Sequence, residues 1–149
     1  MSRVNKYRGK DRKTGQWVYG SYVKTAIGLH YIVPQNLISN ELLMFVVDPE
    51  TVGQFIGLPD KNDKEIYQGD LVEYTRIIYA DCSRTEIEDI QEPVTGEIYY
   101  AEGLWLGIKF ADGTGKLFLP GQVSTQEKNP ELEVIGNIYE HSHLMEIAQ

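Results

Sequence analysis

The side chains best suited to chemistry are a single cysteine and a pair of histidines near the C-terminus. Cys82 follows Asp81 in an acidic segment, and a negative neighbour disfavours the thiolate that nucleophilic catalysis requires. His141 and His143 would lie on one side of an extended segment, beside two glutamates, but no third soft ligand is close in sequence. We therefore expect surface histidines and neither a catalytic cysteine nor a metal site.

Other short patterns also lack the partners that their chemistry needs. The Gly115-Lys116 pair lacks the glycine five residues earlier and the following Ser or Thr of a phosphate-binding loop, because Phe110 and Leu117 occupy those positions. Four clustered acids in residues 79–93 lack the glycine-punctuated loop of a tight calcium site. These are Glu86, Glu88, Asp89 and Glu92. The sequence thus predicts no enzyme activity and no cofactor.

Charge is divided unequally along the 149 residues, whose formal net charge is −8. Residues 1–24 hold seven basic residues and one acid, a charge of +6, while residues 25–149 hold seven and 21, a charge of −14. The basic segment can pair with the acidic remainder, within the chain or across a subunit contact. The alternative is binding of single-stranded DNA or RNA. Its basic residues are Arg3, Lys6, Arg8, Lys10, Arg12 and Lys13.

Aromatic residues offer a second candidate surface, since tyrosine supplies 10 of the 16 aromatic residues. Tyr99 and Trp105 flank one expected hairpin, where they could hold a partner strand or a stacked base, although packing in the core is the favoured interpretation. Only Lys109 and Lys116 accompany them, so nucleic acid is not favoured there. The candidate partner-binding residues are Arg8, Lys10, Arg12, Trp17, Tyr99 and Trp105.

The elements that would position these residues are short strands, because apolar residues recur with a period of two between turn residues. A first hairpin is expected from residues 7–9 and 16–24 around a turn at Gly15, followed by strands 29–33 and 41–47. Asp48 and Pro49 favour a single helical turn.

The second half continues this all-β pattern. A polar, turn-rich stretch over 57–70 precedes a strand over 71–78, and residues 79–93 are expected to form a mobile acidic loop. The later strands are expected over 96–100, 104–110, 116–119 and 132–139. A last helical turn is expected around Leu144. Five short strands with tight connections match a small barrel, which closes its own edges.

Four segments carry a family resemblance. The stretch Thr51–Val72, the opening residues 6–9 and 14–20, and the closing strand Val134–Glu140 together resemble the YopX family of phage and prophage proteins. One departure is Asp63, where the family usually carries glycine; aspartate tolerates a left-handed backbone less well. The resemblance implies an SH3-like barrel in the C-terminal part and a soluble, self-associating protein, and it supplies no catalytic residues.

These observations lead to one set of expectations. The fold is mainly β, with an N-terminal β-region over residues 1–60, which carries the basic hairpin, and an SH3-like barrel over 61–149. The chain is a non-enzymatic binding or assembly module that forms a homo-oligomer or contacts a phage or host protein. Its longest apolar stretch, Leu42–Val47, is too short to span a membrane. A single cysteine and no signal segment place it in the cytoplasm of a bacterial host.

Overall fold

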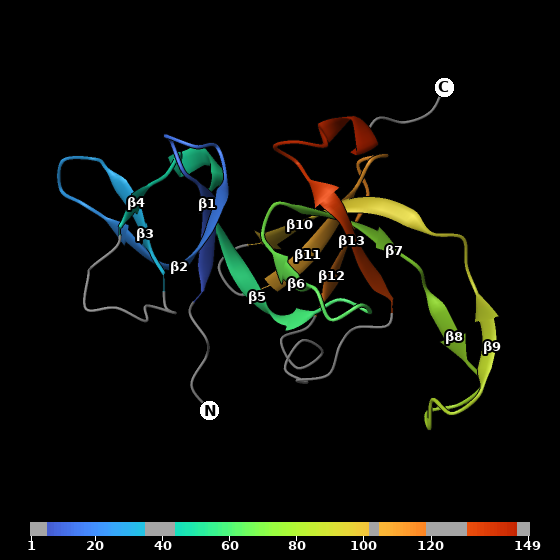
Figure 1. The fold of residues 1–149 in the computed structure, drawn as a ribbon. Coiled ribbons are helices and arrows are strands. Elements are labelled where there is room, and N and C mark those ends of the chain that lie inside the picture. Colours follow the sequence, from blue (N-terminus) through green and yellow to red (C-terminus); the bar gives the residue numbers. More distant parts are fainter. Residues whose placement is uncertain (1–5, 35–43, 102–104, 119–130, 146–149) are drawn as a thin grey trace. The chain divides into compact units, whose positions relative to one another are not determined.

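Two units make up the chain, one over residues 1–56 and one over 57–149. The computed structural model describes residues 6–34, 44–101, 105–118 and 131–145 (Figure 1). The boundary lies four residues before the one expected from the sequence. No helix of the described residues is long and apolar enough to cross a bilayer.

The strands of the first unit belong to a six-stranded sheet of order β4-β3-β2-β1-β5-β6, in which β5 continues past residue 56 and β6 (Glu65–Tyr67) is the last strand. The predicted first hairpin is confirmed, the third strand ends before Pro34, and Asp48 begins one turn of helix. The elements are β1 (Tyr7–Lys10), β2 (Trp17–Lys24), β3 (His30–Val33), β4 (Phe45–Val46), η1 (Pro49–Thr51) and β5 (Gly53–Pro59). Strand β5 was not expected, because two glycines and a proline disfavour a strand; pairing of Gln54 with Tyr7 of β1 supplies the missing stability.

One face of this sheet is the core of the unit. Ile32 and Val47 are fully buried there, and Val47 packs so closely on Gly9 that a Cβ on Gly9 would lie 3.0 Å from it. The ring of Tyr22 lies 5.5 Å from that of Tyr7, and its hydroxyl hydrogen-bonds His30 Nδ1. Because strand residues alternate between faces, the residues next to these in β1 and β2 point to the opposite side.

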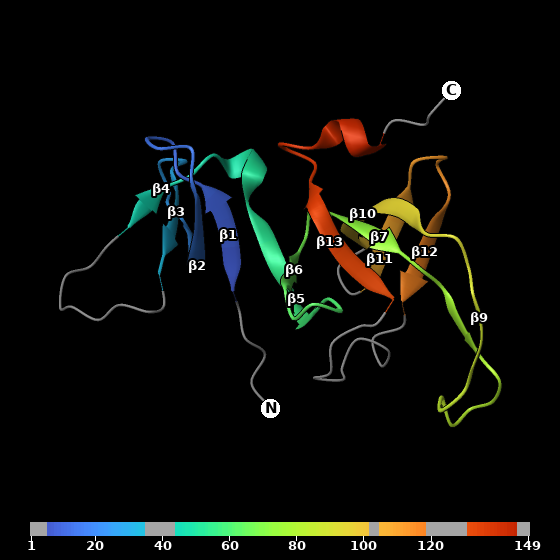
Figure 2. The same cartoon turned by 45° about the vertical axis from the view of Figure 1, so that its right-hand side comes forward.

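The second unit contains a five-stranded antiparallel sheet of order β12-β11-β10-β7-β13 (Figure 2). Its strands are β7 (Asp70–Tyr74), β10 (Val94–Ala101), β11 (Trp105–Phe110), β12 (Gly115–Phe118) and β13 (Leu132–Asn137); β6 (Glu65–Tyr67) precedes them and η3 (Ser142–Met145) follows. Leu71, Val72, Ile98 and Ile108 are fully buried. The mainly β class is confirmed, as are four of the five predicted strands within the described residues; the strand predicted over 71–78 instead ends at Tyr74, and residues 77–79 belong to another sheet. No pairing of β12 with β13 occurs among the described residues, so the closed SH3-like barrel stays a prediction.

A buried aspartate ties the turn before β6 to the last strand of this sheet. The carboxylate of Asp60 is 1% exposed; its Oδ1 accepts the N–H groups of Asn62 and Lys64, at 2.8 and 2.9 Å, and its Oδ2 accepts the N–H of Val134 at 2.8 Å. The N–H of Lys61 adds a bond to the Leu132 carbonyl. These bonds join segments more than seventy positions apart in sequence.

A second buried aspartate sets the entry into β7. Asp70 is 2% exposed and its Oδ2 accepts the N–H of Tyr67 at 2.8 Å. Between these two residues, Gly69 donates to the Ile98 carbonyl and accepts from Ile138. The segment over residues 60–70 is therefore structural, as its polar, turn-rich sequence predicts.

The expected acidic loop differs most from the structure. Instead of a loop over 79–93, strands β8 (Ile77–Tyr79) and β9 (Ile87–Ile90) form a separate two-stranded hairpin. Two isoleucines in β9 lie three positions apart, which hides the period of two that would have indicated a strand.

We expect Asp60→Asn to lower the free energy of unfolding by about 1–3 kcal/mol, because either amide orientation turns an NH2 group toward a backbone donor. Urea denaturation of the full chain measures this change. The control is Asp89→Asn on the exposed hairpin, which should stay within about 0.5 kcal/mol of the parent. Equal stability of Asp60→Asn and the parent would contradict the role of the carboxylate.

Asp63 has a left-handed backbone, with φ of 64°. This agrees with the glycine that the YopX family usually carries at this position. Replacing it by glycine should raise the free energy of unfolding by about 0.5–1 kcal/mol, since L side chains are strained in this region. Asp63→Ala should lower it by a similar amount, because alanine has neither the freedom of glycine nor the local hydrogen bonding of aspartate. Thermal unfolding of the three proteins would show the order Gly, Asp, Ala; any other order refutes the strain.

Candidate functional site

Cationic and aromatic side chains share one face of the β1–β2 hairpin. Lys6, Arg8 and Lys10 are two positions apart along the chain, and the antiparallel register places Tyr19 opposite Arg8 and Trp17 opposite Lys10. These five residues lie on the side of the hairpin opposite to the core. We call them the basic–aromatic face.

The cations of this face lie over its rings. The guanidinium carbon of Arg8 is 4.6 Å from the ring centroid of Trp17, and Lys10 Nζ is 5.6 Å from the same centroid. Lys6 Nζ is 5.9 Å from the ring centroid of Tyr19. Each distance is within the roughly 6 Å range of a cation–π contact, worth about 0.5–1 kcal/mol at an exposed site. The contacts hold the positive charges in a row beside the rings.

Exposure separates the residues of this face into two roles. Tyr19 is 43% exposed, and Lys6, Lys10 and Trp17 are half-buried. Arg8 is only 6% exposed, so its guanidinium supports Trp17 and offers little surface of its own. A contact made here would therefore involve mainly the two lysines and the two rings.

The remaining basic candidates contribute less. Arg12 Nε donates to Asp48 Oδ1 at 3.2 Å, and both side chains are about half exposed, so this pair is charge-balanced. It is one instance of the basic segment pairing with an acid from the remainder of the chain. Lys13 lies in the exposed turn, where its N–H donates to Asp11. Arg3 lies outside the described residues.

The aromatic candidates of the second unit are placed differently. The ring of Tyr99 covers Gly107 on the neighbouring strand, since a Cβ on that glycine would be 2.7 Å from two ring carbons. Such a ring replaces the packing that a glycine leaves open in a strand. Trp105 pairs with Ala101 at the start of β11, and its side chain lies outside what the structure describes. The structure gives Tyr99 a packing role.

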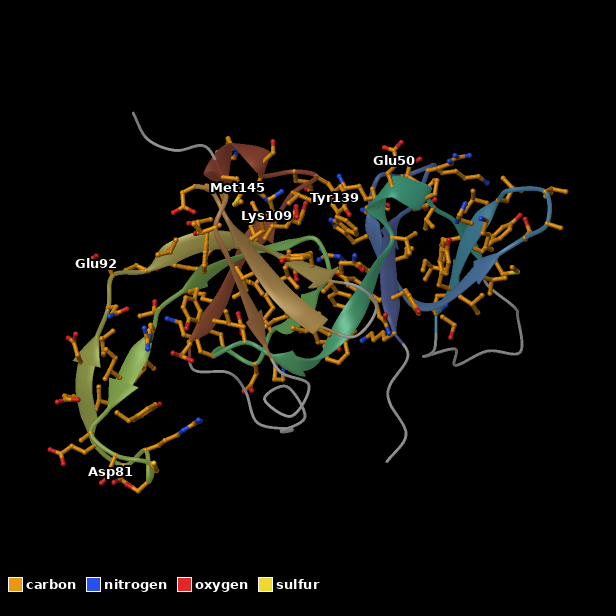
Figure 3. All side chains as sticks on the ribbon, turned by 180° about the vertical axis from the view of Figure 1, so that it is seen from behind. Glu50, Asp81, Glu92, Lys109, Tyr139 and Met145 are labelled. Carbon is orange, nitrogen blue, oxygen red and sulfur yellow. The ribbon has the colours of Figure 1, made fainter. Side chains whose placement is uncertain are left out.

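One charged pair accompanies Tyr99 on this sheet. Glu97 of β10 lies opposite Lys109 of β11, and Figure 3 labels the lysine. Burial raises the pKa of Glu97, and the positive charge of Lys109 acts in the opposite direction. The two residues are therefore an acid and a base that face each other across neighbouring strands.

The cysteine and the histidines that were considered for catalysis or metal binding lie in or next to turns. His141 Nδ1 accepts the N–H of Asn137 at 3.2 Å, and Cys82 is exposed in the turn between β8 and β9. Asp112 caps the predicted hairpin turn, where hydrogen bonds from the hydroxyl and N–H of Thr114 lower its pKa. No three His, Cys, Asp or Glu side chains gather as metal ligands within the described part of the chain.

Sequence reasoning identified the basic hairpin and Trp17, but it did not recognise that rings and cations interleave there. Tyr19 was missed as a member of the face. The signal was present, because a turn at Gly15 places residue 17 opposite 10 and residue 19 opposite 8. Pairing the residues across this hairpin would have revealed the alternation of rings and cations that the sequence analysis looked for around Trp105.

We expect Gly107→Ala to displace the Tyr99 ring and to lower the free energy of unfolding by about 1–2 kcal/mol. In a Tyr99→Ala background the same substitution should be nearly neutral, because the ring that it meets is gone. A double-mutant cycle in urea measures this coupling. Additive effects would show that Tyr99 does not cover Gly107.

Comparisons with known proteins bear on the family. None of the curated proteins matches the chain. The crystal structure of protein EF1440 from Enterococcus faecalis is 18% identical, with a TM-score of 0.47, and the match covers 97% of this chain and 100% of that chain. The model of the family described as YopX protein matches residues 6–146, nearly the whole chain. The chain therefore belongs to the YopX protein family.

Proposed function

We propose that the chain is a non-enzymatic binding or assembly module of phage or prophage type, which acts through protein–protein contacts in the cytoplasm of a bacterial host. The observation that supports this most directly is the basic–aromatic face. Its cations are already held over Trp17 and Tyr19, at 4.6–5.9 Å from the ring centroids. Such an arrangement needs little reordering when a partner binds.

The chemistry of the face indicates what it would recognise. Trp and Tyr are enriched at the centres of protein interfaces, where they supply large apolar area with few rotatable bonds. Lys6 and Lys10 stand beside them and favour carboxylates. The partner segment that fits is therefore one that combines apolar side chains with aspartate or glutamate.

Single-stranded nucleic acid is the second candidate for this face. Alternating cations and rings suit a backbone of phosphates with stacked bases. Against it stands the −14 charge of residues 25–149, which repels a polyanion over the range of a Debye length, about 8–10 Å. Because this repulsion grows with the charge of the ligand, it acts less strongly on a short protein segment with a few carboxylates among apolar side chains, and we favour that segment.

The test is the double variant Lys6→Glu/Lys10→Glu, compared with Lys24→Glu/Lys64→Glu, which makes the same charge change at exposed lysines outside the face. The probes are a fluorescent peptide of alternating glutamate and isoleucine and a fluorescent oligothymidylate, followed by anisotropy at low and high salt. We expect the peptide to bind the parent and the control, and to bind the face variant at least about tenfold more weakly.

Circular dichroism of both variants verifies that they are folded. Peptide binding that survives Lys6→Glu/Lys10→Glu contradicts the proposal. If the oligothymidylate binds and the face variant abolishes that binding while the peptide does not bind, the nucleic-acid function holds instead. A parent that binds neither probe at low salt contradicts both.

A further inference from the structure

The β8–β9 hairpin, here called the arm, has one apolar face. Its register pairs Tyr79 with Ile87 and Ile77 with Ile90, and a bulge between these pairs absorbs one residue of β9. Without the bulge Ile87 and Ile90 would point to opposite sides, because they are three positions apart. With it, four large apolar side chains lie on one side of the hairpin.

Two of the four side chains on this face, those of Ile87 and Ile90, are open to solvent, whereas Ile77 and Tyr79 are half-buried and the guanidinium carbon of Arg84 lies 5.9 Å from the Tyr79 ring centroid. Ile87 is 52% exposed and Ile90 is 58% exposed, and every residue from 80 to 94 is exposed. The arm forms a two-stranded sheet of its own, which projects from the five strands of its unit in Figures 1 and 2. A hairpin without a third strand or a covering layer is marginally stable in water. A partner that covered the exposed isoleucines would therefore stabilise the arm.

The arm nevertheless has a fixed base and an ordered tip. At the base, Glu131 accepts the N–H of Ile77 through its carboxylate, at 2.9 Å, and the N–H of Thr75 through its carbonyl. At the tip, the hydroxyl and N–H of Ser83 donate to Asp81 and lower the pKa of that carboxylate. The arm therefore presents its face from a defined position in its unit.

Negative charge surrounds the apolar face. Residues 79–93 hold five acids and one base, and Figure 3 shows two of the acids, Asp81 at the tip and Glu92 at the far end of β9. Pairing two arms side by side would cover the isoleucines but would bring like charges together. Charge therefore argues against an arm-to-arm contact and for a basic, aromatic receptor.

We propose that the arm binds the basic–aromatic face of a second copy of the chain. This inference rests on the proposed function, since it names the partner of the same face. Ile87 and Ile90 would contact the rings of Trp17 and Tyr19, while the acids beside them meet Lys6 and Lys10. Because each copy carries one arm and one face, two copies can bind reciprocally, and successive copies can also form a ring or an open chain.

The first experiment measures self-association of the full chain by light scattering over a concentration series. The arm variant is Ile87→Ser/Ile90→Ser, and the control is Ile27→Ser/Met44→Ser, which removes two exposed apolar residues, 82% and 42% exposed, from the first unit outside the basic–aromatic face. We expect the arm variant to need at least about tenfold more protein for association. The control should associate like the parent.

The second experiment tests the pairing directly by exchanging charges. Glu88→Lys/Glu92→Lys on the arm and Lys6→Glu/Lys10→Glu on the face should each prevent association alone. When the two variants are mixed, one of them tagged, they should associate again. The reversed arm of one variant then meets the reversed face of the other, and the unchanged arm and face meet each other.

Any one of three results would overturn the inference. These are a parent that stays monomeric at every concentration, an arm variant that associates like the parent, and a mixture that fails to associate. If these results occur while Lys6→Glu/Lys10→Glu still weakens binding of the acidic peptide, only the arm contact fails. If that peptide binding is also unaffected, the proposed function fails as well.

Discussion

The second unit depends on a carboxylate that cannot reach water. Asp60 is 1% exposed, and three backbone N–H groups surround it, two from its own turn and one from Val134 in the last strand. Burial of a charged group is costly unless hydrogen bonds compensate it, and here they also fix the register between distant segments. Asp70 acts on the entry to β7 in a similar way. The turn that holds the sheet together therefore lies within Thr51–Val72, one of the segments that resemble the YopX family.

The sequence predicted correctly those strands in which the local residue pattern and the pairing within the sheet both favour a strand. Turns at Gly15 and Gly113, both with positive φ, separate alternating segments, and the hairpins form there as expected. Strand β5 escaped prediction because its glycines and proline oppose a strand, while its partner β1 lies more than forty residues earlier. The arm escaped because its bulge breaks the period of two.

Prediction of the candidate site was limited for a related reason. Charge alone located the basic segment, yet it ranked Arg8 with Lys10, although one is buried against Trp17 and the other is half-buried at the surface. It also grouped Tyr99 with the binding residues, and the structure adds that this ring packs over Gly107. Composition identifies which residues are able to bind, but only register and burial decide which of them are presented.

The same distinction applies to the acids, which supply the −14 charge of residues 25–149. Asp60 and Asp70 are buried inside the second unit, where backbone donors bind their carboxylates, so these two acids are not available for direct contact with a partner. The acids of the arm remain exposed beside exposed isoleucines. The charge of the described residues is therefore not uniformly distributed, and in the contact that we propose between copies the arm supplies the acids and the basic–aromatic face supplies the cations.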